Sequence, residues 1–200
     1  SRHDITTISL GEGIPGHLLH NKYLNSDSNV PQFRQHPDVS RLMDAPTKFP
    51  VDAAFTEGWK LYAQYLGEEL GLYNDPYQRL GWYSSELLHA SQLVVDTGIH
   101  ALGWSRDQAV QYMSHHTSLQ EMEIQDEINR IITLPSQACT YKLGERKIKD
   151  LRKTAENYLG SSFNIRDFHD TLLQCSSSFT IVEHCMRDYI GQSESVEINA

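Results

Sequence analysis

The sequence contains few cysteines and no long hydrophobic run. Its three cysteines, Cys139, Cys175 and Cys185, are an odd number without CxxC spacing, so we expect buried thiols, with one pair able to form a disulfide in an oxidising compartment. No apolar stretch approaches the roughly 18 residues of a transmembrane helix, which excludes a membrane span. The chain starts at Ser1 without Met or a signal peptide, which predicts a piece of a longer protein or a processed product.

Clusters of basic residues are also missing. The 200 residues include 17 Lys and Arg against 26 Asp and Glu, a net charge of −9, and the basic side chains are scattered. This distribution argues against an electrostatic footprint for nucleic acid or for anionic lipid. With 39% hydrophobic and 22% charged residues, the composition is that of an ordinary soluble globular protein. We predict one domain over residues 1–190 and a flexible tail over residues 191–200.

Alternating, strand-like patterns are absent, whereas apolar residues recur at helical spacing along much of the chain. The segment 53–70 carries one apolar stripe at three- and four-residue steps, and Asp75-Pro76 is a helix start for a segment that reaches His100. Residues 25–50, rich in Asn, Ser, Asp and Pro, predict a long ordered loop. The predicted fold is therefore all-α, with many helices. Further helix starts are expected at Ser105 and Thr117, from capping-box spacing, and at Pro135, Asn164 and Thr180.

The segment from Gly11 to His17 is the strongest candidate for a chemical site. A zinc hydrolase needs imidazole and carboxylate ligands that leave one position open for water, and a further carboxylate that takes a proton from that water. Glu12 stands where such a general base is expected, His17 follows downstream, and Glu57 is an acid on a separate helix. Pro15 interrupts a regular helix, so a broken turn must bring His17 to the metal.

Each of these residues also has a purely structural interpretation. Ser9 and Glu12 have the spacing of a capping box, in which Glu12 would close the start of a helix. His17 would be a half-buried, hydrogen-bonded histidine after the turn, and His20, which could replace or assist it, is expected to face solvent. Glu57 lies at a helix start, where the macrodipole favours an acid without any function. The residues alone leave both interpretations open.

Two later segments add titratable groups. Asp96 and His100 lie one turn apart near a helix end, so Asp96 could orient the imidazole; the alternative is a histidine that the helix dipole favours there. Tyr141 follows the Pro135 segment, and its phenol could stabilise an oxyanion, although a buried tyrosine with one hydrogen bond is the more frequent case. The aromatic side chains of the 53–70 stripe predict packing rather than a cofactor site.

Four motifs, in this order, resemble one bacterial family. They are residues 12–17 (EGIPGH), 54–62 (AFTEGWKLY), 93–105 (LVVDTGIHALGWS) and 135–144 (PSQACTYKLG). Together they are similar to the C-terminal part of a poorly characterised family, often exported lipoproteins, in the zincin-like metallopeptidase superfamily. The resemblance implies a helical domain of the gluzincin type against which a missing N-terminal portion packs. It also implies the cell envelope, the periplasm or secretion as the location, with the cytoplasm as an alternative.

The resemblance implies roles for the matching residues. Glu12 would be the general base, and His17 and Glu57 would bind zinc. Tyr141 would act in catalysis, and His100 would bind the substrate, a peptide. The inferred chemistry is the attack of a zinc-activated water on a peptide carbonyl.

The chain departs from the family pattern at three positions. Gly11 stands where the first zinc-binding histidine is expected, Leu18 where a second histidine often follows, and Gln92 where an arginine is expected. With one ligand missing, zinc is expected to be weakly bound or absent, and Gly11→His is predicted to bind it tightly. The function then has two interpretations: a zinc-dependent peptidase-like hydrolase, or a non-catalytic helical scaffold (a pseudoenzyme) that binds peptides or protein partners.

Overall fold

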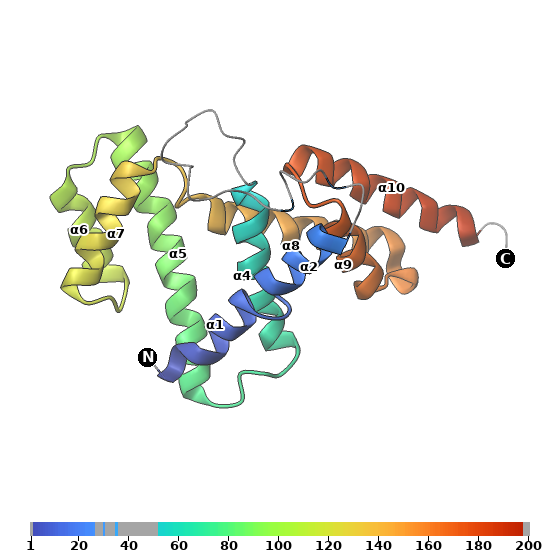
Figure 1. Cartoon of the computed structure of the whole chain (residues 1–200), viewed down its shortest axis with the longest axis horizontal. Coiled ribbons are helices and arrows are strands. Elements are labelled where there is room, and N and C mark those ends of the chain that lie inside the picture. Colours follow the sequence, from blue (N-terminus) through green and yellow to red (C-terminus); the bar gives the residue numbers. More distant parts are fainter. Residues whose placement is uncertain (1, 27–29, 31–34, 36–51, 198–200) are drawn as a thin grey trace.

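The chain folds into helices joined by turns (Figure 1). A computed structural model describes residues 2–26, 30, 35 and 52–197, with residues 192–197 by backbone alone. No strand occurs in these ranges, so the predicted all-α fold is confirmed, while the predicted loop near residues 25–50 lies almost wholly outside them. The elements, with 3₁₀ turns written η, are η1 (Arg2–Asp4), α1 (Ile5–Glu12), α2 (His17–Ser26), α4 (Ala53–Glu69), α5 (Pro76–Leu102), α6 (Arg106–His116), α7 (Glu121–Thr133), α8 (Thr140–Leu159), η3 (Gly160–Ser162), α9 (Ile165–Gln174) and α10 (Phe179–Glu197).

Several helix starts lie where the local sequence predicts them. The Asp75 carboxylate accepts a hydrogen bond from the first turn of α5, and Pro76 takes the first helical position. Ser105 and Gln108 form the reciprocal capping box at the start of α6. The Asn164 side chain accepts a hydrogen bond from the first turn of α9. These starts are confirmed because the capping residues act through contacts within three positions of the chain.

Two predicted helix starts are wrong. The box that opens α7 is formed by Gln120 and Glu123, so this helix begins later than the Thr117 spacing suggests. Pro135 leads into a turn in which Ser136 adopts a φ of 65°, and α8 begins only after it, at residue 140. Gln120 and Glu123 form the complete reciprocal box at the first place, and at the second the turn at Ser136 keeps Pro135 outside α8.

The apolar side chains form two separate buried clusters. One joins α4, α8, α9 and α10 around residues such as Trp59 and Phe168. The other joins α5, α6 and α7 around Met113 and Ile128. Between them, α1 lies against both α4 and α5, and α2 continues from it across α4 (Figure 1). The chain segments that carry the candidate site therefore meet where the two clusters adjoin.

Helices α4 and α8 cross at very short range because small residues face each other. A Cβ atom added at Gly144 would lie 1.9 Å from the carbonyl oxygen of Ala54, and one added at Gly58 would lie 2.4 Å from the carbonyl carbon of Gly144. No side chain fits in either place. Because Glu57 precedes Gly58 and Tyr141 lies one turn before Gly144, the crossing brings both functional candidates to the same region.

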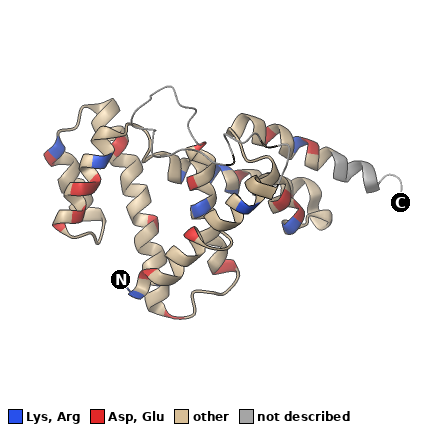
Figure 2. Cartoon of the chain, viewed as in Figure 1, with Lys and Arg blue, Asp and Glu red and all other residues tan. Residues whose placement is uncertain are grey.

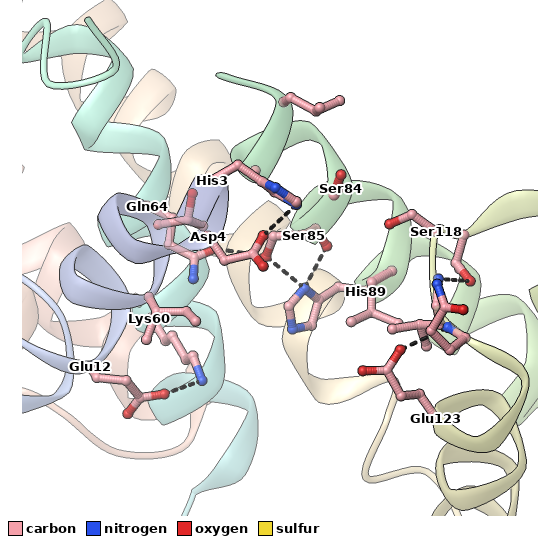
Figure 3. A pocket seen from close by; sticks show the side chains of 18 residues that line it. His3, Asp4, Glu12, Lys60, Gln64, Ser84, Ser85, His89, Ser118 and Glu123 are labelled. Atoms are coloured by element: carbon pink, nitrogen blue, oxygen red, sulfur yellow. Dashed lines mark hydrogen bonds and ion pairs between the residues drawn. The ribbon is translucent and has the colours of Figure 1, made fainter. Parts of the chain in front are cut away.

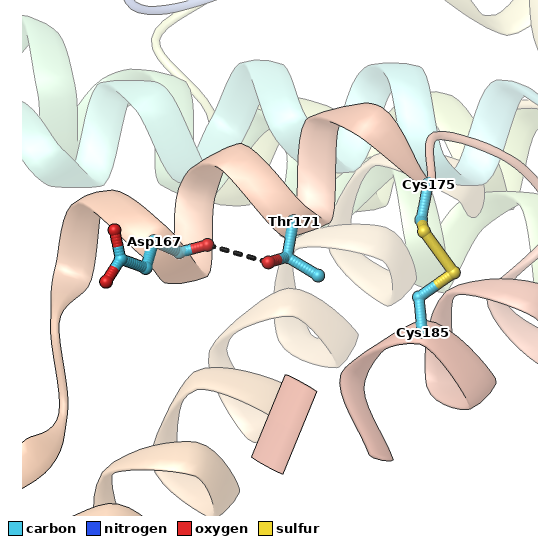
Figure 4. Close-up of a disulfide and its surroundings, with 4 residues drawn as sticks. All are labelled: Asp167, Thr171, Cys175 and Cys185. Atoms are coloured by element: carbon cyan, nitrogen blue, oxygen red, sulfur yellow. Dashed lines mark hydrogen bonds between the residues drawn. A yellow bond between two sulfur atoms is a disulfide. The ribbon is translucent and has the colours of Figure 1, made fainter. Parts of the chain in front are cut away.

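A disulfide joins the end of α9 to α10 (Figure 4). Cys175 and Cys185 form it with a Cα–Cα distance of 6.4 Å, and Cys139 is a free cysteine. The expectation of three buried thiols is therefore wrong for this pair, and the alternative of one disulfide holds. The short turn between α9 and α10 folds the chain back and brings the two cysteines together, which spacing in the sequence does not reveal. Helix α10 continues to residue 197, into the segment predicted to be a tail.

Charged side chains of both signs share the same helices (Figure 2). On α8, for example, the Lys142 ammonium lies 2.8 Å from the Glu86 carboxylate and 2.5 Å from Glu145, which also pairs with Lys149 at 2.5 Å. Many of the acidic groups are thus balanced locally, despite the negative net charge. Within the described ranges, none of the helices combines the length and the apolarity that a membrane span requires.

Candidate functional site

A sharp turn separates Glu12 from His17. Helix α1 ends at Glu12 and α2 begins at His17, with residues 13–16 forming the turn between them, as the sequence predicts. The indole N–H of Trp59 donates hydrogen bonds to the carbonyl oxygens of Pro15 and Gly16 at 2.9 and 3.2 Å. The turn that carries His17 is therefore fixed to the middle of α4.

Glu12 is held by a lysine on α4. It is the last residue of α1, so the interpretation in which it caps a helix start with Ser9 is wrong. Its carboxylate accepts a hydrogen bond from the Lys60 ammonium at 2.5 Å. Burial alone raises the pKa of Glu12, but the hydrogen bond and the charge of Lys60 outweigh burial and lower that pKa. A carboxylate paired in this way is a weaker proton acceptor than a free one.

His17 and Glu57, the two predicted metal ligands, lie side by side. The distance from Nε2 of His17 to Oε2 of Glu57 is 3.5 Å. Two ligand atoms of one tetrahedral zinc ion lie about 3.4 Å apart, given bonds of about 2.0 to 2.2 Å. Oε2 of Glu57 is buried and has no hydrogen-bond partner among the described residues. The pair thus has the spacing that two ligands of a single metal ion need.

Other side chains crowd the space beside Gly11, where the remaining predicted ligand would stand. A Cβ atom added at Gly11 would lie 2.8 Å from Nε2 of Gln64, 3.1 Å from Cγ of Lys60 and 3.4 Å from its Cε. Over the part of the chain that the structure describes, no group of three His, Cys, Asp or Glu side chains could hold a metal ion. Protein zinc sites have at least three protein ligands. The described residues therefore do not supply the ligand set of an ordinary zinc site.

Tyr141 lies close to His89 and Glu57. Its ring is 4.9 Å from the ring of His89, centre to centre, and its hydroxyl accepts a hydrogen bond of 3.3 Å from the Gln137 amide. Arg130 donates a hydrogen bond to the oxygen of that amide. Burial, and then the carboxylate of Glu57, raise the pKa of Tyr141. The phenol therefore stays protonated and can donate a hydrogen bond to a ligand.

His89 and Lys60 are site residues that the sequence analysis missed. His89 is buried on α5, where its Nδ1–H donates to the Ser85 carbonyl at 2.7 Å, and burial lowers its pKa to about 4, with the charge of Lys60 acting in the same direction. Lys60 follows Glu57 by three positions on α4, so the two side chains share a helix face. That spacing could have identified Lys60, whereas nothing in the sequence distinguishes His89 from its neighbours on the α5 stripe.

A cavity of about 610 Å³ lies between α1, α4, α5 and the segment that joins α6 to α7 (Figure 3). Glu12 and Lys60 form part of one wall, Ser84 and His89 of α5 form another, and Ser118 lies across from them. This volume is in the range of small-ligand pockets, about 300 to 1,000 Å³. Polar groups that can hydrogen-bond in either direction face a space large enough for a few amino acids.

His100 lies at the interface of α5 and α7. Its Nε2 hydrogen-bonds to the Ile131 carbonyl at 3.0 Å, whereas Asp96 accepts from the backbone N–H of Ser136 at 3.1 Å. The alternative in which Asp96 orients His100 is therefore wrong; the substrate-binding role of His100 stays a prediction. His20 is also not as predicted, because it is 2% exposed and bonded to a serine hydroxyl beyond α9. Packing of α2 on α4 and α9 buries it.

The fold and the site define an all-helical domain in which two predicted metal ligands, His17 and Glu57, lie side by side. Comparison of the sequence with known families gives a match over residues 1–177 to the family described as "Bacterial protein of unknown function (DUF885)". The chain belongs to this bacterial family. The resemblance found in the four motifs is confirmed to that extent. No match was found among curated proteins.

Two solved structures are similar to this one. That of "the putative lipoprotein from Colwellia psychrerythraea" has a TM-score of 0.85 and 34% identity over 96% of this chain. That of "a putative lipoprotein of unknown function from Shewanella oneidensis" has a TM-score of 0.71 and 23% identity over 92% of this chain, which shows the fold. In both cases the chain covers 31% of the relative's length.

Proposed function

We propose that this domain is a non-catalytic member of a zincin-like peptidase lineage and that it binds a peptide in the cavity between α1, α4 and α5. One observation carries the proposal: the Lys60 ammonium is bonded at 2.5 Å to Glu12, the residue expected to act as base. A zinc-activated water needs three protein ligands and a carboxylate free to take its proton. With glycine at position 11 and Lys60 on Glu12, neither requirement is met by the described residues.

The lining of the cavity supports a peptide as the ligand. Each peptide residue offers one N–H donor and one carbonyl acceptor, and the walls present the hydroxyl of Ser84, the amide of Gln64 and the imidazole of His89. Ile8 and Leu88 add apolar surface for side chains. Mixed walls of this kind fix the orientation of a ligand while burying its apolar parts.

The test is to fill the cavity. Ser84→Trp places a large ring in it from α5, and Ala90→Trp puts the same ring on an exposed position of the same helix. Each protein is incubated overnight with a tryptic digest of casein, and the peptides retained with it on a filter are identified by mass spectrometry. We expect unchanged peptide masses throughout, and retention that falls by about tenfold or more in Ser84→Trp alone. Equal retention by both folded variants would contradict the assignment of the cavity.

The second candidate function is zinc-dependent peptide hydrolysis, which the 3.5 Å separation of His17 and Glu57 favours. A third ligand would have to come from outside the described residues, for example from the rest of a longer chain. Elemental analysis after dialysis against zinc decides between the two candidates. About one zinc per chain, together with cleavage of the casein peptides, would support hydrolysis and overturn the non-catalytic role. Protein without retained zinc and without cleavage is the expected result.

We infer that the protein acts in the cell envelope or outside the cell. Two observations support this location: the disulfide between Cys175 and Cys185, since such bonds persist in oxidising compartments, and the description of both structural relatives as "putative lipoprotein". Fractionation of cells that express the natural gene, with detection of the protein by antibody, tests it. Recovery in the cytosolic fraction with three reduced cysteines would contradict this location.

We also propose that, in a protein as long as the two relatives, a preceding segment packs against α1 and α5. Apolar side chains of these helices that do not line the cavity are more than half exposed, namely Ile5, Tyr83 and Leu87. An exposed apolar surface of this kind marks an interaction site. The dye ANS should therefore fluoresce with this domain and much less with the longer protein. Equal fluorescence from both would contradict the packing.

A further inference from the structure

The side chain of Lys60 occupies the space that a ligand at position 11 would need. Its Cγ and Cε lie 3.1 and 3.4 Å from the place of a Cβ at Gly11, and Nε2 of Gln64 lies 2.8 Å from it, so a histidine there would be crowded by both side chains. The stem cannot swing away freely, because its ammonium is bonded to Glu12 and its side chain is only 20% exposed. Because Gly11 has no side chain, the side chain of Lys60 fits beside it.

Lys60 also supplies the positive charge that the surrounding acids require. It neutralises Glu12 directly, at 2.5 Å, and it lies one helical turn from Glu57 on α4. Oε2 of Glu57 is buried, and among the described residues it has no hydrogen-bond partner, although the imidazole of His17 is 3.5 Å away. A buried carboxylate of this kind requires a compensating cation nearby. In a metal site that cation is the ion; here an ammonium is already present.

We propose that the Lys60 ammonium is the resident cation of this site and excludes a zinc ion from the His17–Glu57 pair. A fixed ammonium and a divalent ion on neighbouring side chains repel each other, and the more strongly the less water screens them. In contrast to the tight binding predicted from the sequence, Gly11→His alone then fails to restore a zinc site, because the new imidazole meets both the bulk and the charge of Lys60. The inference does not depend on whether the cavity binds a peptide.

Substitutions at positions 60 and 11 separate charge from volume. Lys60→Met removes the charge and keeps most of the side-chain length; Lys60→Ala removes both; Gly11→His supplies the third ligand. Zinc affinity is measured by competition with a chromophoric chelator, and cobalt(II) absorption reports tetrahedral coordination. We expect Lys60→Met to bind zinc about tenfold more tightly than the unaltered protein. Gly11→His combined with Lys60→Ala should bind it about a hundredfold more tightly than Gly11→His alone.

Lys147→Met is the matched control, because Lys147 pairs with Glu183 on α10, away from the site, and its loss should leave zinc affinity unchanged. Circular dichroism and melting curves establish that each variant is folded. Two results would each overturn the proposal: equal affinity of Gly11→His with and without Lys60→Ala, or no gain from Lys60→Met in folded protein. The second result does not depend on whether the double variant folds. Peptide retention, measured in parallel on the unaltered protein and on Lys147→Met, shows separately whether the cavity function holds.

Discussion

At the scale of single residues, Trp59 links the packing of the core to the position of His17. Its ring is 1% exposed and lies 5.6 Å from the ring of Tyr62 and 5.7 Å from that of His169, centre to centre. Its N–H meanwhile holds the carbonyl groups of the turn before His17. One buried side chain therefore serves both the larger apolar cluster and the candidate site.

We predict that Trp59→Phe lowers the free energy of unfolding by about 2–4 kcal/mol, through the lost hydrogen bonds to Pro15 and Gly16 and the volume removed from the cluster. Urea unfolding followed by circular dichroism measures the change. Trp82→Phe is the control, since the Trp82 N–H is buried without a hydrogen-bond partner among the described residues. It should cost clearly less, and equal losses would show that the bonds to the turn contribute nothing.

Some residues of the candidate site could be predicted from the sequence and others could not. His17 and Glu57 are paired as their positions suggest, because each belongs to a motif with a recognisable spacing. Lys60 was missed because a lysine on an amphipathic helix normally lies in solvent. His89 was missed because a histidine within an apolar stripe normally lies in the core. The contact of Lys60 with Glu12 spans 48 residues of sequence, and no local pattern encodes it.

At the scale of elements, helix starts with a single clear cap were predictable and helix crossings were not. Asp75 and Ser105 define α5 and α6 through contacts with the following turn. The α4–α8 crossing instead depends on Gly58 and Gly144, 86 positions apart in the sequence, each of which alone would be taken as a weak point of its helix. Only their juxtaposition shows that they permit a close approach.

We predict that Gly144→Ala destabilises the fold by about 3 kcal/mol or more, because the methyl group would meet the Ala54 carbonyl at 1.9 Å and force α4 and α8 apart. Gly191→Ala, on α10, is the same substitution in open surroundings: of the described atoms, none lies within 4 Å of the added Cβ. It should be neutral or stabilising by up to about 1 kcal/mol. Melting curves of both variants measure the difference, and similar melting temperatures would refute the close crossing.

At the scale of the whole molecule, α5 and α9 each carry a histidine whose pKa is lowered by burial. His89 of α5 borders the candidate site, and Nε2 of His169 on α9 shares a hydrogen bond of 2.9 Å with the Tyr62 hydroxyl. Burial lowers the pKa of both to about 4, and for His169 the charge of Arg152 adds to the effect. Both parts of the molecule therefore share one sensitivity to acid.

We predict that the free energy of unfolding falls as the pH is lowered from 7 to 5. At pH 7 both histidines are neutral in either state; below about 6.5 the unfolded chain binds protons that the folded chain excludes until about pH 4. Stability therefore decreases through this window, by about 1–2 kcal/mol for each histidine at pH 5. Above pH 5 the acids with lowered pKa values, such as Glu12, remain charged and do not contribute. Urea unfolding at several pH values measures the dependence of the free energy of unfolding on pH. His169→Gln should roughly halve this dependence, while His184→Gln, at an exposed position, should leave it unchanged. A flat profile for the unaltered protein would show that burial keeps neither histidine neutral.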